Sequence, residues 1–250
     1  MVECQKRSRA AYPDRDAAFD YGEGTVTKDE MGAKMEREMK LGLYVITYAQ
    51  AAPGKGHLDV ARAALEGGAD TLQLRDKEMG GRGMYDLCVQ IKELLERGGG
   101  GCAFFVNDRV DVAMAAGADG VHLGQEDLPA ASARSLVGED MVMGISATTR
   151  EEAERAWAEG ADYLGVGPVF VTPTKPDAVP PIGIEGLREI REAVDLPIVA
   201  IGGIDEDNAR AVLEAGADGI AVISAVTGAE DMLEAVRRLR RAVDVCLAGR

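Results

Sequence analysis

One motif occurs four times along the chain, and it constrains the fold more than any other feature of the sequence. Each copy combines the end of a helix, a glycine, the pair Ala-Asp and an apolar run. The copies are ALEGGADTLQLR (64–75), AMAAGADGVHLG (113–124), AWAEGADYLGVG (156–167) and VLEAGADGIAVI (212–223). Glycine suits a helix end because it adopts the left-handed conformation without a Cβ clash. The repeat therefore predicts tandem helix–strand units from Leu41 onward.

Four further apolar runs lie between the repeats, so that eight strands are predicted. They are LYVIT (43–47), AFFV (103–106), MVMGI (141–145) and PIVAI (197–201). Helical patterns follow at 57–66, 84–97, 109–116, 130–136, 149–159, 184–194, 205–215 and 229–243, with Thr149 and Asp205 as capping residues. Strands that are apolar throughout are buried on both faces, as in parallel sheets with helical crossovers. Eight such units predict an α/β fold, a (β/α)8 TIM barrel.

The domain organisation is a single barrel with a tail. Residues 39–250 are predicted to form the catalytic barrel domain. Residues 1–38 are polar, and we expect an N-terminal extension that is disordered or partly helical, or that precedes a later start codon. An open doubly wound sheet is the alternative fold, but the GxGxxG fingerprint is absent after the first strand.

Charge and cysteine content narrow the classes of partner and compartment. Lys+Arg 28 against Asp+Glu 43 gives a net charge of −15, which repels nucleic acid and anionic lipid, although a salt-adapted host is another source of such acidity. We expect small-molecule substrates, no nucleic-acid partner and no membrane association, and the sequence leaves a homo-oligomer open. The four cysteines are scattered without a CxxC pair, so neither zinc nor a disulfide framework is indicated. A cytoplasmic location follows as an expectation.

The loops after the strands build the active site of such a barrel. Gln73, Arg75 and Lys77 alternate along the second strand, so we expect all three to face the barrel mouth. Arginine and lysine together can hold an anion, whereas a merely solvated strand end is the alternative interpretation. Asp108 and Asp127 follow adjacent strands, and their oxygens suit Mg²⁺. The alternative for each aspartate is a helix cap.

Three other segments carry polar residues at predicted strand ends. The 17-residue loop GPVFVTPTKPDAVPPIG (167–183) is long enough to be a lid or binding loop. Gly202–Gly203 and Ser224 match the phosphate-binding loops seven and eight of many barrels. His122 is interpreted as a satisfied core or rim residue, and His57 as the start of a surface helix. No Ser/His/Asp or Cys/His arrangement is visible, which argues against an acyl-enzyme.

These motifs jointly resemble the thiamine phosphate synthase family over about residues 41–243. The resemblance is carried by QLRDK (73–77), VND (106–108), HLGQEDLP (122–129), GIS (144–146), GVGPVFVTPTK (165–175), AIGGI (200–204) and AVIS (221–224). The family joins hydroxymethylpyrimidine diphosphate to thiazole ethyl phosphate and releases diphosphate. The resemblance implies a Mg²⁺-assisted dissociative substitution, with the thiazole phosphate or its carboxylated form as the acceptor.

The resemblance also implies a role for particular residues. The residues expected to bind the pyrimidine diphosphate are Gln73, Leu74, Arg75, Asp76, Lys77, Asn107, Ser146 and Lys175, of which Arg75, Lys77, Ser146 and Lys175 would be catalytic. The residues expected to bind the thiazole phosphate are Thr172, Pro173, Thr174, Gly202, Gly203, Ile223 and Ser224. Asp108 and Asp127 would bind the Mg²⁺ cofactor.

The chain departs from the family pattern in several places. Tyr48 follows the first strand where the family often has Asp, and the N-terminal extension is unusual. Ala147 and Thr148 stand where a sister group of thiazole tautomerases carries a histidine, which favours the synthase. A non-catalytic thiazole-phosphate sensor would not need the paired aspartates or Lys175. A sugar-phosphate isomerase or epimerase would need an acid–base pair or metal-binding histidines, and the chain has only two histidines.

Overall fold

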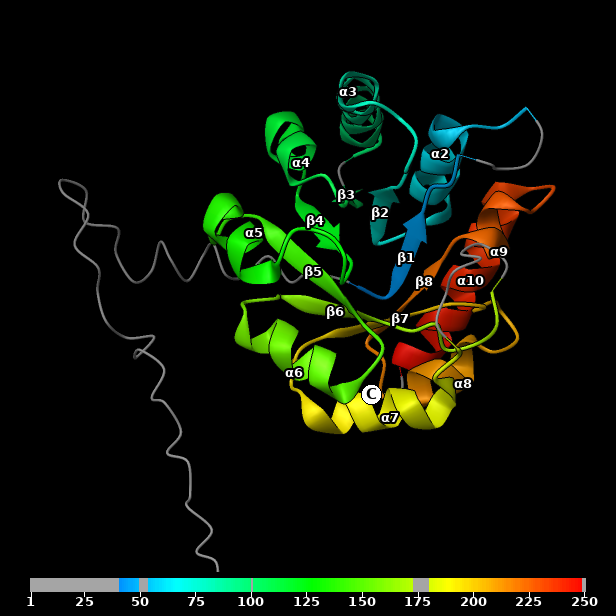
Figure 1. Ribbon diagram of the computed structural model, residues 1–250. Helices are drawn as coiled ribbons and strands as arrows, with labels where there is room; N and C mark the ends of the chain where they lie inside the picture. The colour runs from blue at the N-terminus through cyan, green and yellow to red at the C-terminus, as the bar shows by residue number, and fades with distance from the viewer. Residues whose placement is uncertain (1–40, 50–53, 100, 173–179, 249–250) are drawn as a thin grey trace, which may run out of the picture. The chain divides into compact units, whose positions relative to one another are not determined.

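The computed structural model describes residues 41–49, 54–99, 101–172 and 180–248. The chain divides into the units Met1–Met39 and Lys40–Arg250, and every described residue belongs to the second. Its eight strands are parallel and pair in chain order, and the last closes on the first (Figure 1). The closed barrel confirms the predicted fold.

Helices surround the barrel on the outside, as Figure 1 shows. The strands are β1 (Leu43–Ile46), β2 (Thr71–Leu74), β3 (Ala103–Asn107), β4 (Gly120–Leu123), β5 (Val142–Ala147), β6 (Tyr163–Val166), β7 (Ile198–Ile201) and β8 (Gly219–Val222). The helices are α2 (His57–Gly67), α3 (Gly81–Arg97), α4 (Val110–Ala116), α5 (Ala130–Val137), α6 (Arg150–Ala158), α7 (Gly183–Ala193), α8 (Ala209–Glu214), α9 (Ser224–Thr227) and α10 (Met232–Leu247).

The aspartate of each repeat ties neighbouring strands together at the start of the barrel. Its carboxylate accepts a hydrogen bond from a backbone amide on the adjacent strand. The four bonds are Leu43 N to Asp70 at 2.8 Å, Phe104 N to Asp119 at 2.8 Å, Met143 N to Asp162 at 2.7 Å and Ile198 N to Asp218 at 2.8 Å. The motif thus joins alternate pairs of neighbouring strands, which explains its fourfold recurrence.

The barrel interior is filled by aromatic rings for which glycines leave room. Tyr44, Phe105 and Tyr163 are fully buried, with ring centroids 5.8–6.2 Å apart. A Cβ atom at Gly144 would lie 2.1 Å from the Tyr163 ring, and one at Gly165 would lie 2.7 Å from His122. The aliphatic residues that alternate with these pack outward against the helices.

Several predicted boundaries are wrong, and local hydrogen bonds explain why. The α8 helix begins at Ala209, because the Asp205 carboxylate accepts bonds from the amides of Asp207 and Asn208 and closes a turn before it. The last helix begins at Met232, since the Asp231 side chain caps it, and residues 224–227 form the separate helix α9. The α3 helix already begins at Gly81. The cap at Thr149 is confirmed.

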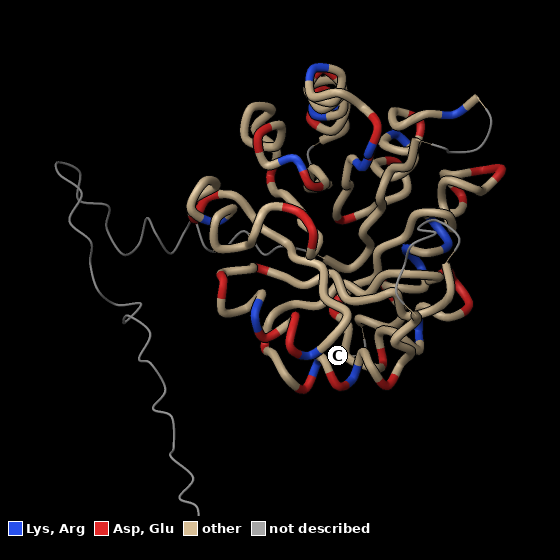
Figure 2. The backbone as a smooth tube through the Cα atoms, viewed as in Figure 1, with Lys and Arg blue, Asp and Glu red and all other residues tan. Residues whose placement is uncertain are grey.

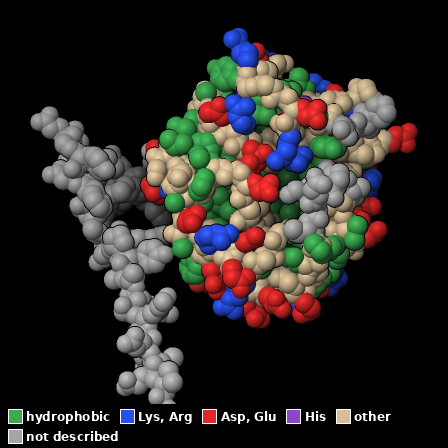
Figure 3. Space-filling model, viewed as in Figure 1, with side chains coloured by type: hydrophobic (Ala, Val, Ile, Leu, Met, Phe, Trp, Pro, Cys, Tyr) green, Lys and Arg blue, Asp and Glu red, His purple; other side chains and the backbone are tan. Residues whose placement is uncertain are grey.

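Charged side chains are distributed around the outside of the barrel. None of the eight strands contains Lys, Arg, Asp or Glu (Figure 2). Figure 3 shows acidic side chains gathered along the lower edge of the visible face, over α6 and α7. Within the described part of the chain, no helix combines the length and apolarity that a membrane crossing requires.

Candidate active site at the barrel mouth

Cationic and acidic side chains meet where β2, β3 and β4 end. The ammonium of Lys77 lies 3.0 Å from a carboxylate oxygen of Asp108. Burial raises the pKa of Asp108, the neighbouring Asp127 carboxyl adds to that increase, and Lys77 acts in the opposite direction. The structure therefore brings the two predicted metal ligands together beside one of the predicted anion-binding lysines.

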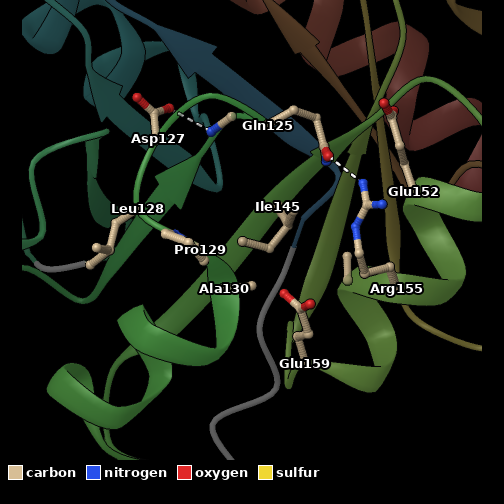
Figure 4. Close-up of a pocket in the computed structure, with 11 residues that line it drawn as sticks. Gln125, Asp127, Leu128, Pro129, Ala130, Ile145, Glu152, Arg155 and Glu159 are labelled. Carbon is tan, nitrogen blue, oxygen red and sulfur yellow. Dashed lines mark hydrogen bonds between the residues drawn. The ribbon is translucent and has the colours of Figure 1, made fainter.

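Neither aspartate caps a helix, so that alternative interpretation is wrong. The cap positions of α4 and α5 are Arg109 and Pro129, and neither has a side-chain cap. Asp127 instead accepts a 2.7 Å hydrogen bond from the Gly124 amide, as Figure 4 shows. Asp108 has a left-handed backbone, with φ of 61°. Among non-glycine residues, Asp and Asn adopt this conformation most readily.

The two carboxylates fit a magnesium ion by their chemistry. Both ligands are oxygen, which Mg²⁺ prefers, and two carboxylates in contact repel unless a cation or proton lies between them. Among the described residues, no cluster of three or more His, Cys, Asp or Glu side chains could hold a metal alone. Mg²⁺ held by Asp108 and Asp127 would therefore need substrate phosphate and water to complete its coordination.

Arg75 is held at the mouth by a buried network that the sequence did not indicate. Its amide donates to Thr47 Oγ1 at 3.0 Å, and its guanidinium lies 5.9 Å from the centroid of the Tyr48 ring. His57 Nδ1 lies 2.8 Å from Thr47 Oγ1, and His57 Nε2 lies 3.1 Å from Asp76. His57 begins α2 as predicted but is buried, so its predicted surface position is wrong.

Of Gln73, Arg75 and Lys77, only Gln73 lies within β2, so the prediction that all three alternate along that strand is wrong for the other two. β2 ends at Leu74, and the next residues turn because Asp76 accepts bonds from the amides of Glu78 and Met79. Burial acts to raise the pKa of Asp76, but these bonds and the one from His57 lower it overall. The Asp76 carboxylate is thus already engaged within the protein.

A Thr47→Val substitution tests the network behind Arg75. It keeps the side-chain volume but removes the oxygen that bonds to Arg75 and His57. We expect the free energy of unfolding to fall by about 1–3 kcal/mol, because two buried polar groups lose their partner. Urea unfolding measures this, with the exposed Ser135→Ala as the control. An unchanged unfolding midpoint would contradict the network.

The other residues expected to bind the pyrimidine diphosphate lie in three places: inside the barrel, between the sheet and the helices, and at the ends of strands. Gln73 is buried inside the barrel and donates to the Tyr44 hydroxyl at 2.8 Å. Leu74 is fully buried and packs outward in the cluster between sheet and helices, so its side chain does not reach the mouth. Asn107 and Ser146 stand near the ends of β3 and β5.

His122 lies inside the barrel, and its interpretation as a satisfied residue is confirmed. Its Nδ1 is 2.9 Å from the Tyr163 hydroxyl, and its Nε2 is 3.0 Å from Ser146 Oγ. Burial lowers the pKa of His122 from 6.5 to about 4, and the charge of Asp127 opposes this weakly. The imidazole is therefore neutral at neutral pH.

The low pKa of His122 makes stability depend on pH. Between pH 6.5 and 4 the unfolded chain binds a proton at this histidine and the folded protein does not. The free energy of unfolding should therefore fall by up to about 3 kcal/mol as pH falls through that window. Above pH 6.5 the histidine is neutral in both states, so none of this stability is lost there. Chemical unfolding at several pH values measures this. His122→Gln should flatten the slope, and an identical slope in both proteins would contradict the assignment.

The loops that follow β6 and β7 pack closely against each other beside the mouth. The Phe170 amide donates to the Gly202 carbonyl at 2.9 Å, and Asn208 donates to the Gly203 carbonyl. Both glycines have positive φ, and a Cβ at either would collide with Pro168 or Phe170. The predicted reason for these glycines is close approach of a phosphate, but their packing against the loop after β6 also requires glycine. Thr172 is described, but Pro173, Thr174 and Lys175 lie outside the described residues.

Ile223 and Ser224 lie at the start of the short helix α9. Ile223 is its cap residue and Ser224 its first residue, and the Ser224 side chain is exposed. The amides of a first helical turn have no acceptor within the helix. The two residues thus follow β8 at the same end of the barrel as Gly202 and Gly203.

A separate pocket of about 190 Å³ opens beside the mouth between α5 and α6 (Figure 4). Gln125 crosses its upper side, where it donates to the Ser146 carbonyl at 2.6 Å and accepts from Arg155 at 2.7 Å. Asp127 is the one predicted site residue in its lining. The mouth remains the candidate active site, because Lys77 there pairs with Asp108, whose carboxyl group neighbours that of Asp127.

The closed parallel barrel with its helical crossovers places the protein in the (β/α)8 class, in which active sites are built from the loops after the strands. The family model of thiamine monophosphate synthase matches residues 43–226, and the chain belongs to this family. The thiamine-phosphate synthase of Moorella thermoacetica is 53% identical over 201 residues, covering 80% of this chain and 95% of that protein. That of Chloroflexus aurantiacus is 52% identical over 203 residues, or 81% and 93%.

A solved structure agrees with the sequence relatives. Thiamine phosphate pyrophosphorylase from Pyrococcus furiosus superposes with a TM-score of 0.75 at 47% identity, covering 84% of this chain and 98% of that one. A 3-hexulose-6-phosphate synthase structure, at 20% identity and a TM-score of 0.61, shares the fold.

Proposed function

We propose that the chain forms thiamine phosphate from an aminopyrimidine methyl diphosphate and a thiazole ethyl phosphate, or its carboxylated form. One observation supports this most directly: Lys77, Asp108 and Asp127, from three successive strand ends, lie together at the mouth. A leaving diphosphate needs such a mixture of cationic groups and metal-binding carboxylates. Membership in the family supplies the substrate class.

The reaction breaks the C–O bond to diphosphate and forms a C–N bond to the thiazole nitrogen. The aminopyrimidine ring can stabilise positive charge on its exocyclic carbon, so the C–O bond can break first. Diphosphate leaves with the bonding electrons, and the thiazole nitrogen supplies the new pair. Because the nucleophile is a lone pair, no general base is required.

The residues of the chain then act mainly through charge and position. Arg75, Lys77 and Lys175 would face the diphosphate, and their charges would stabilise it as it departs. Mg²⁺ held by Asp108 and Asp127 would add electrostatic stabilisation of the same group. Ser146, Asn107 and Gln73 would orient the pyrimidine diphosphate by hydrogen bonds.

The thiazole phosphate would bind on the opposite side of the mouth. Gly202, Gly203, Ile223 and Ser224 would hold its phosphate through backbone amides and a hydroxyl. Thr172, Pro173 and Thr174 would contact the ring. The acidic surface is consistent with proposed partners that are small molecules and not nucleic acid or membrane. A cytoplasmic location remains a prediction, and a homo-oligomer remains open.

The first experiment is to measure diphosphate release from the pyrimidine diphosphate with Mg²⁺, in the presence and absence of thiazole phosphate. We expect release that requires the thiazole, Mg²⁺ and Lys175, with thiamine phosphate as the product. Tight binding of thiazole phosphate without turnover would instead indicate a tautomerase-like or non-catalytic barrel, and the magnesium assignment would then be abandoned.

A further inference from the structure

Five polar side chains form a continuous hydrogen-bonded chain across the barrel interior. Gln73 Nε2 lies 2.8 Å from the Tyr44 hydroxyl, and that hydroxyl lies 3.0 Å from the hydroxyl of Tyr163. Tyr163 lies 2.9 Å from His122 Nδ1, and His122 Nε2 lies 3.0 Å from Ser146 Oγ. The two ends, Gln73 and Ser146, are both residues assigned above to the pyrimidine diphosphate. The three residues between them have no role so far.

The middle of this interior chain is closed to water. Tyr44 and Tyr163 are each 1% exposed, and Gln73 is 2% exposed. Burial keeps both phenols protonated, since it raises the pKa of Tyr44 and that of Tyr163 above their usual value. Each hydroxyl hydrogen must therefore be donated within the interior chain, because a buried donor without an acceptor is costly.

This requirement gives the hydrogen bonds one direction. The Gln73 side-chain nitrogen can only donate, so the Tyr44 oxygen accepts from it. Tyr44 then gives its single hydrogen to the Tyr163 oxygen, and Tyr163 gives its own to His122 Nδ1. A neutral imidazole that accepts at Nδ1 carries its hydrogen on Nε2. His122 therefore donates to Ser146 Oγ.

Ser146 is left with one hydroxyl hydrogen that the interior chain does not use. Its oxygen already accepts from His122, and its backbone is held by the bond from Gln125 to its carbonyl. Diphosphate oxygens accept hydrogen bonds and do not donate them when ionised. A serine that binds diphosphate must therefore donate, and this direction is the one that the interior chain imposes.

We propose that Tyr163 and His122 are positioning residues that fix the Ser146 hydroxyl as a hydrogen-bond donor toward the leaving diphosphate. The identity of the group that Ser146 faces rests on the proposed function. The direction of the interior chain is a property of the protein without substrate. Turning the Gln73 amide over would reverse every bond, place the His122 hydrogen on Nδ1 and direct the Ser146 hydrogen into the barrel.

The tautomer of His122 tests the direction in the substrate-free protein. Nitrogen NMR of histidine-labelled protein distinguishes the protonated ring nitrogen from the bare one, and the chain has only two histidines. A His57→Gln variant assigns the two sets of signals. We expect His122 to carry its hydrogen on Nε2. A hydrogen on Nδ1 would overturn the proposal, whatever reaction the enzyme catalyses.

Tyr→Phe variants test the role of the interior chain. Tyr163→Phe removes the hydroxyl that donates to His122, so we expect a mixture of tautomers and a roughly tenfold lower kcat, with the KM for thiazole phosphate unchanged. Tyr44→Phe interrupts the chain one step earlier and should leave the His122 tautomer as it is. The exposed Tyr85→Phe on α3 is the matched control for kcat.

Double variants separate positioning from mere structural support. In a Ser146→Ala background, Tyr163→Phe should lower kcat no further, because the hydroxyl that it orients is gone. Equal and independent losses, or a Tyr163→Phe protein with wild-type tautomer and kcat, would overturn the proposal. If Tyr163→Phe does not fold, the wild-type tautomer still decides. Absence of diphosphate release by the wild-type protein would contradict the proposed function alone.

Discussion

Asp108→Asn is expected to lower kcat by about 10²–10³-fold while leaving the fold intact. Asparagine tolerates the left-handed backbone at this position, where alanine would be strained, so the substitution isolates the loss of charge. It removes one of the two carboxylates that would hold Mg²⁺ and leaves Lys77 without its partner at 3.0 Å. The lower kcat should be accompanied by an increase in the Mg²⁺ concentration needed for half-maximal activity.

Steady-state diphosphate release over a range of Mg²⁺ concentrations measures both effects. Asp111→Asn is the matched control, because Asp111 is an exposed residue of α4 whose carboxylate forms an ion pair with Arg109 at the surface. It should retain near-normal activity. Near-normal turnover of Asp108→Asn with an unchanged Mg²⁺ dependence would eliminate the metal assignment.

Gly144→Ala should destabilise the protein by about 3–5 kcal/mol, since it combines overpacking with the loss of buried hydrogen bonds. The new methyl group would lie 2.1 Å from the Tyr163 ring. Tyr163 cannot move aside without breaking its bonds to Tyr44 and His122. Thermal or urea unfolding measures the loss.

Two comparisons make this expectation specific to the barrel interior. Gly101→Ala lies in open space at the surface and should change stability by less than about 0.5 kcal/mol. In a Tyr163→Leu background the ring is gone, so Gly144→Ala should cost much less than in the wild type. An equal cost in both backgrounds would show that the clash is not its source.

Local sequence signals predicted the barrel well because they act over short distances. A glycine that ends a helix, as Gly68 and Gly117 do with φ of 85° and 61°, depends only on its own backbone. The capping residue Thr149 bonds three residues ahead. The start of α8 was predicted too early because Asp205 closes a turn before the helix. In the sequence, an aspartate that closes a turn looks the same as one that caps a helix.

Those parts of the candidate site that lie directly after neighbouring strands could be predicted from the sequence. Asp108 and Asp127 come from adjacent strands, and parallel strands bring their ends to one rim, so their proximity could be predicted. The hydrogen bonds that hold Arg75 at the mouth could not be predicted. Thr47 is an ordinary residue at a strand end in the sequence, and only the folded barrel brings its hydroxyl against both the Arg75 amide and His57.

The succession of strands and helices, the barrel class and the rim that carries the candidate site could be predicted from the sequence, because they depend on local conformation and on which residues are apolar. The hydrogen bond from Tyr44 to Tyr163, 119 positions away, and the one between His122 and Tyr163, 41 positions apart, exist only in the folded barrel. Closure of the barrel buries these groups together. Once water is excluded, each must find its hydrogen-bond partner among the others, and no local pattern encodes that choice.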